Sequence, residues 1–339
     1  MNVPKLRFKE FSDEWKKAKL SSFVNINPKN NSLPDKFIYI DLESVNNGLL
    51  TSRKIVNKSE APSRAQRTII KNDILYQTVR PYQMNNLFIN SLDSDYPYIA
   101  STGYALLRTK ENPYFVYSIL YQKSFVNKVL DMCTGTSYPA ISANDLGTIS
   151  ICLPSIKEQE KIGKTLSLLD KKIELQTKKI EDLKLFKKGL SNNIFNNLKN
   201  FEEYKLGDLC NITTGKLDAN AMVENGKYRF YTCAKEYSFI DEYSFDTEAL
   251  LISGNGAYVG YIHYYNGKFN AYQRTYVLDQ FSQNIQFIKC YLDENLSRRI
   301  KSEKKEGNTP YIVLSTLSDM IIKVPSKENQ KNISNIINY

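Results

Sequence analysis

IGKTLSLLDKKIELQTKKIEDLKLFKKGLSNNIF, residues 162–195, is the stretch that decides the fold of this chain. Its apolar side chains recur at alternating steps of four and three residues, and the polar Gln176 and Lys187 fill the two gaps in the pattern. The apolar positions are Ile162, Leu166, Leu169, Ile173, Ile180, Leu183, Leu190 and Ile194. Such a narrow stripe is the seam of a coiled coil. With Pro154 just ahead and lysine and glutamate on the other faces, it predicts one helix of about 40 residues and about 60 Å.

The sequence on the two sides of this helix is an internal repeat. Pro154-Ser155 recurs as Pro325-Ser326, an offset of 171 residues (325 minus 154). The same offset joins Leu146 to Leu317, Ile151 to Ile322, Gln159 to Gln330, Ile162 to Ile333, Ala100 to Ala271, Leu106 to Val277 and Leu107 to Leu278. Nearer the domain starts the offset grows, and Leu20 with Asn25-Ile26 resembles Leu206 with Asn211-Ile212. A glycine precedes the final strand of each copy, at Gly135 and Gly307.

Each copy combines short strands with helices. Runs rich in Tyr, Ile, Val and Phe, bounded by Asn, Gly, Asp or Pro, are typical of strands. The predicted strands are 37–40, 73–79 and 104–108 in the first copy and 249–253, 259–264 and 276–278 in the second, and the predicted helices are 114–130 and 285–301. The glycines in ISGNGAYVGYIHY, residues 252–264, predict a hairpin turn in which glycine and Asn255 supply positive φ.

The predicted fold class is α+β, with two related domains, a long coiled-coil helix between them and a pseudo-two-fold internal repeat. A length of 339 residues suits two domains of about 150 residues and a connector. The predicted boundaries are 1–155 for the first domain, 156–198 for the spacer helix, 199–325 for the second domain and 326–339 for the start of a second helix.

Composition excludes several classes of protein. Hydrophobic residues make up 42% and charged residues 24%, which is typical of a chain that folds. No apolar run approaches the roughly 18 residues of a membrane span. The start, MNVPKLRFKEF, lacks the apolar core of a secretory signal, so we expect a cytoplasmic protein. The five cysteines are scattered, without a CxxC pair, which argues against disulfides and against a structural zinc site.

The net charge of +10 favours an anionic partner. Nucleic acid is preferred over membrane because the sequence contains no strongly basic amphipathic anchor. A basic but otherwise ordinary protein is the alternative that charge alone leaves open.

Catalytic patterns are not supported by the sequence. The one histidine, His263, lies in a tyrosine-rich strand with no nucleophile elbow near it. Gly254, Gly256 and Gly260 miss the GxGxxG spacing, and no Walker A sequence occurs. Asn112-Pro113-Tyr114-Phe115 lacks the second proline of an amino-methyltransferase motif, and Glu303-Lys304-Lys305 lacks the paired upstream Asp of a nuclease. We therefore predict no catalytic residue and no metal site.

Candidate DNA-reading residues lie in predicted loops of both copies. Arg, Gln and Asn are the side chains that read guanine and adenine edges in the major groove, whereas Lys mostly neutralises phosphate. The candidates are Arg64, Arg67, Gln77, Arg80, Tyr82 and Gln83 in the first copy, beside Arg53, Lys54 and Gln66, and Lys235, Asn255, Tyr258, Gln273 and Arg274 in the second, beside Tyr272. A solvated surface role is the alternative for each of them.

The chain resembles the specificity subunit of type I restriction-modification systems. The resemblance rests on PKLRFKEFSDEWKKAKLSSF (4–23), on GTSYPAIS (135–142) followed by ICLP (151–154) and EQEKI (158–162), and on the helical stretch quoted above. It covers essentially the whole chain, and its central motif is specific, whereas the two recognition domains resemble the family only weakly.

The resemblance implies recognition without catalysis. Two target-recognition domains would each read one half of a bipartite site in double-stranded DNA. Half-sites one turn, about 34 Å, apart would lie within reach of the spacer helix. Two methyltransferase subunits would dock on this chain and supply S-adenosylmethionine and adenine methylation, and a restriction motor-nuclease subunit would supply ATP- and Mg²⁺-dependent cleavage. This chain itself would bind no cofactor.

One departure from the family is the short second helix, which we expect to be about 25–30 residues shorter than the first. Much of the 162–194 seam would then pair with another copy of this chain, with a methyltransferase subunit or with a separate fragment, unless the helix packs on its own domain. The functional alternatives are a coiled-coil adaptor, an inactive truncated remnant without its own DNA specificity, and a self-contained DNA methyltransferase or nuclease.

Overall fold

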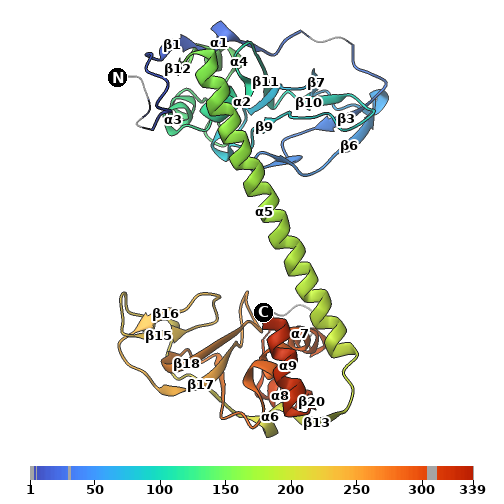
Figure 1. Ribbon diagram of the computed structural model, residues 1–339, viewed down its shortest axis with the longest axis vertical. Coiled ribbons are helices and arrows are strands. Elements are labelled where there is room, and N and C mark those ends of the chain that lie inside the picture. Colours follow the sequence, from blue (N-terminus) through green and yellow to red (C-terminus); the bar gives the residue numbers. More distant parts are fainter. Residues whose placement is uncertain (1–3, 5, 30–31, 304–310, 339) are drawn as a thin grey trace. The chain divides into compact units, whose positions relative to one another are not determined.

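A computed structural model describes residue 4 and residues 6–29, 32–303 and 311–338. The chain separates into two compact units, Met1–Thr177 and Lys178–Tyr339. Helix α5 (Ile156–Asn196) begins in the first unit and ends in the second (Figure 1). Its 41 residues confirm the long helix predicted from the seam. The mixture of sheets and helices on both sides of α5 confirms the predicted α+β class.

The first unit contains two four-stranded sheets. One has the order β6 (Lys54–Asn57), β3 (Lys36–Ile40), β10 (Tyr98–Ser101), β7 (Ala65–Thr68), and the other has the order β2 (Val24–Ile26), β11 (Tyr104–Thr109), β8 (Ile74–Gln77), β9 (Leu87–Phe88). Two-stranded pairs are formed by β1 (Lys16–Lys19) with β12 (Ser150–Leu153) and by β4 (Val45–Asn46) with β5 (Leu49–Leu50). The helices before α5 are α1 (Leu20–Phe23), α2 (Pro113–Ile119), α3 (Lys123–Asp131) and α4 (Ala143–Thr148), with 3-10 turns η1 (Lys58–Glu60) and η2 (Pro81–Gln83).

The second unit is built around one six-stranded sheet. Its order is β14 (Asn211–Thr214), β19 (Thr275–Asp279), β17 (Phe245–Ser253), β18 (Ile262–Ala271), β15 (Tyr228–Tyr231), β16 (Ser238–Ile240). A separate pair joins β13 (Phe201–Lys205) to β20 (Ile321–Pro325), as β1 joins β12 in the first unit. The helices are α6 (Leu206–Leu209), α7 (Ile285–Glu303), α8 (Leu314–Ser318) and α9 (Lys327–Asn338), with a 3-10 turn η3 (Ala219–Ala221).

A buried glutamine anchors the start of α5 in the first unit. Nε2 of Gln159 donates to the main-chain oxygen of Pro154 (3.1 Å) and to Oε2 of Glu111 (2.7 Å), and its Oε1 accepts from the N–H of Asn112 (3.2 Å). Asn112 in turn caps α2, because its Oδ1 accepts from the N–H of Phe115 (2.9 Å). The amide of Gln159 therefore connects the strand end before α5 with the cap of α2.

Gln330 makes the same set of hydrogen bonds in the second unit. Its Nε2 donates to the main-chain oxygen of Pro325 (2.9 Å) and to Oε1 of Gln283 (2.9 Å), and its Oε1 accepts from the N–H of Asn284 (3.0 Å). Oδ1 of Asn284 accepts from the N–H of Phe287 (2.9 Å) and so caps α7. The pairing of Gln159 with Gln330 predicted from the offset is thus a repeat of one hydrogen-bond network. Gly307, the glycine of the second copy, lies outside the described residues.

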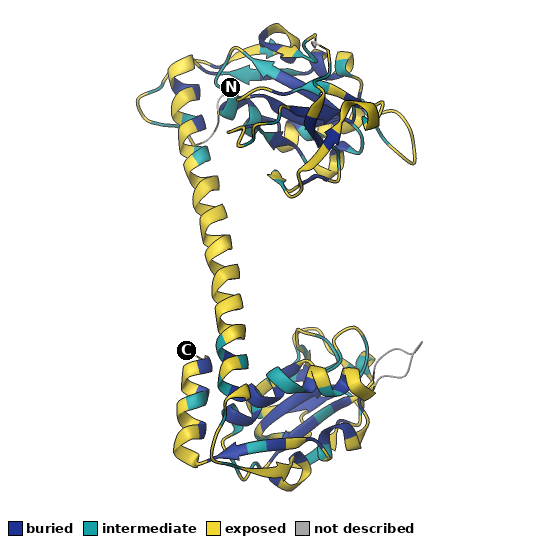
Figure 2. Ribbon diagram, turned by 90° about the vertical axis from the view of Figure 1, so that its right-hand side faces the viewer, coloured by how far each residue is buried: buried dark blue, intermediate teal, exposed yellow. Residues whose placement is uncertain are grey.

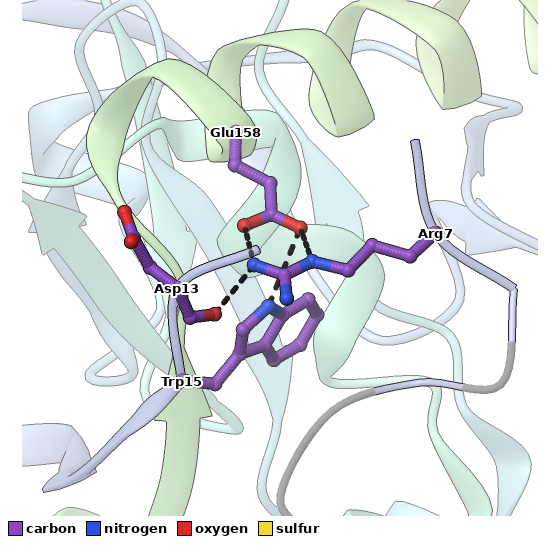
Figure 3. A network of polar contacts seen from close by, with 4 residues as sticks. All are labelled: Arg7, Asp13, Trp15 and Glu158. Carbon is purple, nitrogen blue, oxygen red and sulfur yellow. Dashed lines mark hydrogen bonds and ion pairs between the residues drawn. The ribbon is translucent and has the colours of Figure 1, made fainter. Parts of the chain in front are cut away.

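The first unit has a charged contact at a position where the second unit has an exposed asparagine (Figure 3). Glu158 is buried, and Arg7 donates to it through Nε and Nη2, both at 2.7 Å. Trp15 Nε1 donates to the same carboxylate (3.3 Å), and Arg7 Nη2 also reaches the main-chain oxygen of Asp13 (2.6 Å). The hydrogen bond to Glu158 raises the pKa of Arg7. The 171-residue offset places the exposed Asn329 at the corresponding position of the second unit.

Several of the local predictions are wrong in detail, and the strand predicted over 73–79 is limited to Ile74–Gln77. The single helix expected over 114–130 is two helices, α2 and α3, because Gln122 is extended (φ −63°, ψ 133°). The break lets Phe115 on α2 and Phe125 on α3 enter the same core. The hairpin between β17 and β18 is confirmed, but β18 begins at Ile262 and not at 259. Its positive φ angles belong to Gly256 and Gly260, and Asn255 has none.

The apolar seam of α5 is packed at its two ends and exposed in the middle (Figure 2). Ile162 packs against the core of the first unit, and Ile194 against the core of the second. The central seam residues Leu169, Ile173, Ile180 and Leu183 are each more than half exposed. The alternative of a helix packed along its length on its own domain is therefore wrong. Among the described helices, none is long and apolar enough to cross a membrane.

Replacing Gln330 by alanine should destabilise the second unit. The change removes three hydrogen bonds and leaves the buried main-chain oxygen of Pro325 and the part-buried N–H of Asn284 without that partner. We expect the free energy of unfolding to fall by about 2–3 kcal/mol, measured by urea denaturation. Lys331→Ala, at the next, exposed position of α9, is the matched control and should leave the midpoint unchanged. Equal midpoints for both variants would contradict an anchoring role.

Candidate nucleic-acid interface

The loop of residues 78–86, which joins β8 to β9, is held in an unusual backbone conformation. Arg80 (φ 54°) and Met84 (φ 52°) both lie in the left-handed region and flank the 3-10 turn η2. Neither is a glycine, so this geometry is strained and has to be imposed by surrounding contacts. Strain of this kind is concentrated at binding and catalytic sites in proteins.

Gln77 imposes this conformation from beneath the loop. Its Nε2 donates to the main-chain oxygen of Val79 (2.8 Å) and to Oε1 of Gln83 (2.8 Å), and its Oε1 accepts from the N–H of Asn85 (3.1 Å). Gln77 is 1% exposed. The prediction that it contacts DNA is therefore not supported by its position, because its amide is buried and used within the protein.

The exposed side of the same loop carries an arginine stacked on a tyrosine. The guanidinium carbon of Arg80 lies 4.4 Å from the ring centroid of Tyr138, and the N–H of Arg80 donates to the main-chain oxygen of Pro139 (2.7 Å). Tyr82 and Tyr138 are 50% and 63% exposed. The structure thus joins Arg80 to loop 134–140, and Tyr82 and Gln83 follow it in the same loop 78–86. Sequence reasoning missed Tyr138 as a site residue, although it lies within the GTSYPAIS motif.

The other candidates of the first unit are more dispersed. Arg64 is exposed, and its main-chain oxygen accepts a hydrogen bond from the N–H of Thr102. The next residue, Gly103, accepts a hydrogen bond from the N–H of Thr78 at the start of loop 78–86. Arg67 on β7 is half-buried; burial lowers its pKa, and its Nε has no hydrogen-bond partner in the described part of the chain. The sequence also indicated three further residues. Arg53 pairs with exposed Asp93 (3.6 Å), and Lys54 is exposed on β6. Nε2 of Gln66, on β7 beside Arg67, donates to the main-chain oxygen of Ser63.

In the second unit, contacts between three turns bring the candidates together. The turns are residues 232–237 after β15, 254–261 after β17 and 272–274 before β19. The Nζ of Lys235 lies 5.2 Å from the ring centroid of Tyr258, and the N–H of Gly254 donates to the main-chain oxygen of Arg274 (2.9 Å). A Cβ at Gly254 would lie 2.4 Å from that oxygen, so the close approach requires glycine.

The side chains offered by these turns differ in exposure. Tyr258, Gln273 and Arg274 are exposed, whereas Asn255 and Tyr272 are partly buried. Gln273 Nε2 donates to Oδ1 of Asp218 (3.2 Å). Arg274, by contrast, has its side chain at the surface of the turn.

Loops 78–86 and 254–261 occupy the same place in the two copies. Val79 forms an isolated bridge with Ala140, and Asn255 forms one with Tyr311, which lies 171 residues after Ala140. Next to these bridges, the N–H of Ile141 donates to the oxygen of Thr78 (3.0 Å), and that of Ile312 donates to the oxygen of Gly254 (2.8 Å). The repeat therefore presents an equivalent loop from each unit.

The one histidine has a structural position. Nε2 of His263 lies 3.0 Å from the main-chain oxygen of Ala234, and burial lowers the pKa of the ring. The ring contacts the aromatic rings of Tyr231 and Tyr261. Within the described ranges, no group of three or more His, Cys, Asp or Glu residues is arranged to hold a metal ion.

Sequence comparison relates both halves of the chain to one kind of domain. The family described as the type I restriction modification DNA specificity domain matches residues 12–185 and 198–339. The EcoDI specificity subunit of Escherichia coli is 40% identical over 130 residues, which cover 38% of this chain and 29% of that protein. The HindI specificity subunit of Haemophilus influenzae is 29% identical over 147 residues, covering 41% and 31%. The chain thus spans less than a third of the length of these two relatives.

Two solved structures share the fold. The S subunit of a type I restriction-modification system from M. genitalium matches 99% of this chain and 91% of its own, with a TM-score of 0.68 and 20% identity. A chain from a type I system, solved in work on complex assembly and conformational transition, matches 97% and 90%, with a TM-score of 0.55 and 21% identity. These identities support the fold alone. Because the family matches both halves, this chain belongs to the type I restriction-modification DNA specificity domain family and carries two copies of that domain.

Proposed function

We propose that this chain is the DNA sequence-recognition subunit of a type I restriction-modification complex and acts in the cytoplasm. Each domain would read one half of a bipartite target in double-stranded DNA. The observation that carries the proposal is the equivalent placement of loops 78–86 and 254–261 in two copies of a specificity domain, with one arginine in or next to each loop. Arg80 lies within the first loop, and Arg274 lies in the turn bonded to the second.

The chemistry of these loops suits base reading. An arginine can donate two parallel hydrogen bonds to O6 and N7 of guanine in the major groove. Stacking on Tyr138 limits the orientations of the Arg80 guanidinium, so less conformational entropy is lost when it binds. Because Gln77 fixes the loop backbone from below, the arginine is presented from a rigid frame.

Catalysis would reside in other subunits. We propose that methyltransferase subunits, two per complex, and a restriction motor-nuclease subunit bind this chain and carry S-adenosylmethionine, ATP and Mg²⁺, and that this chain binds none of these. The exposed middle of the α5 seam is available for pairing with a helix of a partner or of a second copy. The assembly described for the type I relative supports partners of this kind.

Binding to duplex DNA should depend steeply on salt. A protein that neutralises phosphates releases counterions, so log K falls with log salt by about 0.9 for each phosphate contacted. We expect a straight line with a slope of several units when gel-shift affinities are measured between about 50 and 200 mM salt. Absence of duplex binding at the lowest salt, with and without methyltransferase, would favour the coiled-coil adaptor or the inactive remnant.

Arg80→Ala and Arg274→Ala should each impair one half-site only. If each guanidinium reads guanine, its loss costs about 1–3 kcal/mol of discrimination at one position. The measurement is competition between the target and duplexes altered in one half at a time. Arg298→Ala, an exposed arginine on α7 paired with Glu294, is the control and should leave both half-sites intact. A uniform loss over all sequences would instead identify phosphate contacts.

Self-association should depend on the exposed seam. We expect the isolated chain to sediment as a dimer at micromolar concentration, because pairing would bury Ile173, Ile180 and their neighbours. Ile173→Lys combined with Ile180→Lys should shift sedimentation to the monomer, whereas Thr177→Lys, off the seam, should not. A clean monomer for the unchanged chain would exclude self-pairing and leave the seam for a different subunit.

A further inference from the structure

One face of the six-stranded sheet in the second unit has no helix packed on its apolar cluster, as far as the structure describes it. Helix α7 covers the opposite face, where its Leu292 and Leu296 pack with Leu250 on β17. The cluster on the first face consists of strand residues alone: Tyr231, Ala249, Leu251, Phe269, Ala271 and Val277, with Phe245 and Tyr265 beside them. We call this the strand-lined face of the sheet, and the six residues of its cluster are themselves buried. Its edge is aromatic and partly exposed, since Tyr237 and Phe239 are 37% and 42% accessible.

Arg229, at the border of the strand-lined face, contacts two tyrosine rings. Its guanidinium carbon lies 4.3 Å from the ring centroid of Tyr237 and 4.5 Å from that of Tyr265. Nη1 of Arg229 donates to the hydroxyl of Tyr231 (3.4 Å), and this hydrogen bond raises the pKa of the arginine. Within the described residues, no carboxylate forms an ion pair with Arg229. In the described chain its charge is therefore accompanied by aromatic rings and one hydroxyl and not by a carboxylate.

The geometry leaves the hydrogen-bonding edge of this arginine available. A guanidinium has five N–H donors in its plane. Rings stacked against the planar group cover its faces and not its edge. One long hydrogen bond to Tyr231 occupies one of these donors. The two rings therefore limit the orientation of the Arg229 guanidinium. Most of its N–H donors have no partner in the described chain.

This arginine adjoins the turns that carry the DNA-reading candidates. Tyr237, one of its stacking partners, belongs to turn 232–237, two residues after Lys235. Lys235 contacts Tyr258 of loop 254–261, and the main-chain oxygen of Ala234 in the same turn bonds to His263 on β18. Arg229 therefore lies next to turn 232–237, which in turn contacts loop 254–261. Arg229 was not predictable from the sequence, because an arginine within a strand pattern looks like an ordinary polar position.

We propose that Arg229 is a specificity-determining residue that reads a guanine through O6 and N7 in the half-site bound by the second domain. The inference rests on the proposed function and adds a named contact outside the loops. Four observations support it. The guanidinium of Arg229 is oriented by two rings, most of its N–H donors are unused, no carboxylate competes for it in the described chain, and it lies next to the candidate loops. A phosphate contact would need only the charge, which an unstacked lysine supplies equally well.

The test compares the full chain with Arg229→Lys in selection from a randomised duplex pool, using methyltransferase subunits in both arms. Lysine keeps the charge and a long stem over the aromatic rings but loses the two-pronged donor set. We expect the variant to lose preference for one guanine in one half-site by about 10- to 100-fold, with the other half-site and the urea midpoint unchanged. Lys268→Gln is the control, since Lys268 stacks on Tyr243 from the opposite side of β18 and should leave the selected sequence unchanged.

The possible outcomes are distinct. Retention of every guanine preference by Arg229→Lys would overturn the proposal, and so would an equal loss of affinity for all sequences, which marks a phosphate contact. A fall in the urea midpoint with an unchanged selected sequence would also overturn it and assign Arg229 to packing. If the unchanged chain selects no sequence at all, the proposed function itself fails, and that result is separate from the others.

Discussion

The amide of one glutamine in each copy is the interaction on which the arrangement of the domain depends. A proline ends the last strand, and the chain must then begin a helix whose first turn lies against the cap of an earlier helix. Gln159 and Gln330 meet this requirement because a carboxamide donates and accepts at once. An alanine, a lysine or a carboxylate there would leave at least one buried group unpaired. The capping asparagines, Asn112 and Asn284, complete the network.

The two copies differ in the charged residue next to this shared glutamine. In the first, the carboxylate of Glu158 lies beside Gln159 in the interior and is matched by the fork of Arg7 and the indole of Trp15. A buried carboxylate is tolerated only with such complete pairing, and removal of one partner is strongly destabilising. At the corresponding position of the second copy, Asn329 is exposed and uncharged, so it needs no buried partner. The ion pair of Arg7 with Glu158 therefore connects the amino-terminal segment of the first copy to the spacer helix.

Sequence predicted the features that depend on periodicity or on direct repetition. The α5 seam follows from apolar spacing, and the Gln159–Gln330 equivalence follows from a constant offset. Burial of a polar side chain was not predictable, because Gln77 and Gln83 look alike in sequence and only the loop geometry distinguishes the buried amide from the exposed one. The contacts of Arg229 with two tyrosine rings were not predictable either. Tyr237 lies in the turn after β15 and Tyr265 lies on β18, and only the folded sheet brings them together. The break before α3 likewise depends on core packing shared by two short helices.

The support of loop 78–86 from beneath separates its shape from its chemistry. Gln77 fixes the backbone through main-chain groups and one neighbouring amide, so the outward side chains of Arg80, Tyr82 and Met84 take no part in most of that scaffold. Exchanging an outward side chain therefore leaves the frame in place, provided that the new residue tolerates positive φ at 80 and 84. A recognition surface built in this way can acquire a new base preference through single amino-acid replacements while the domain beneath it stays the same.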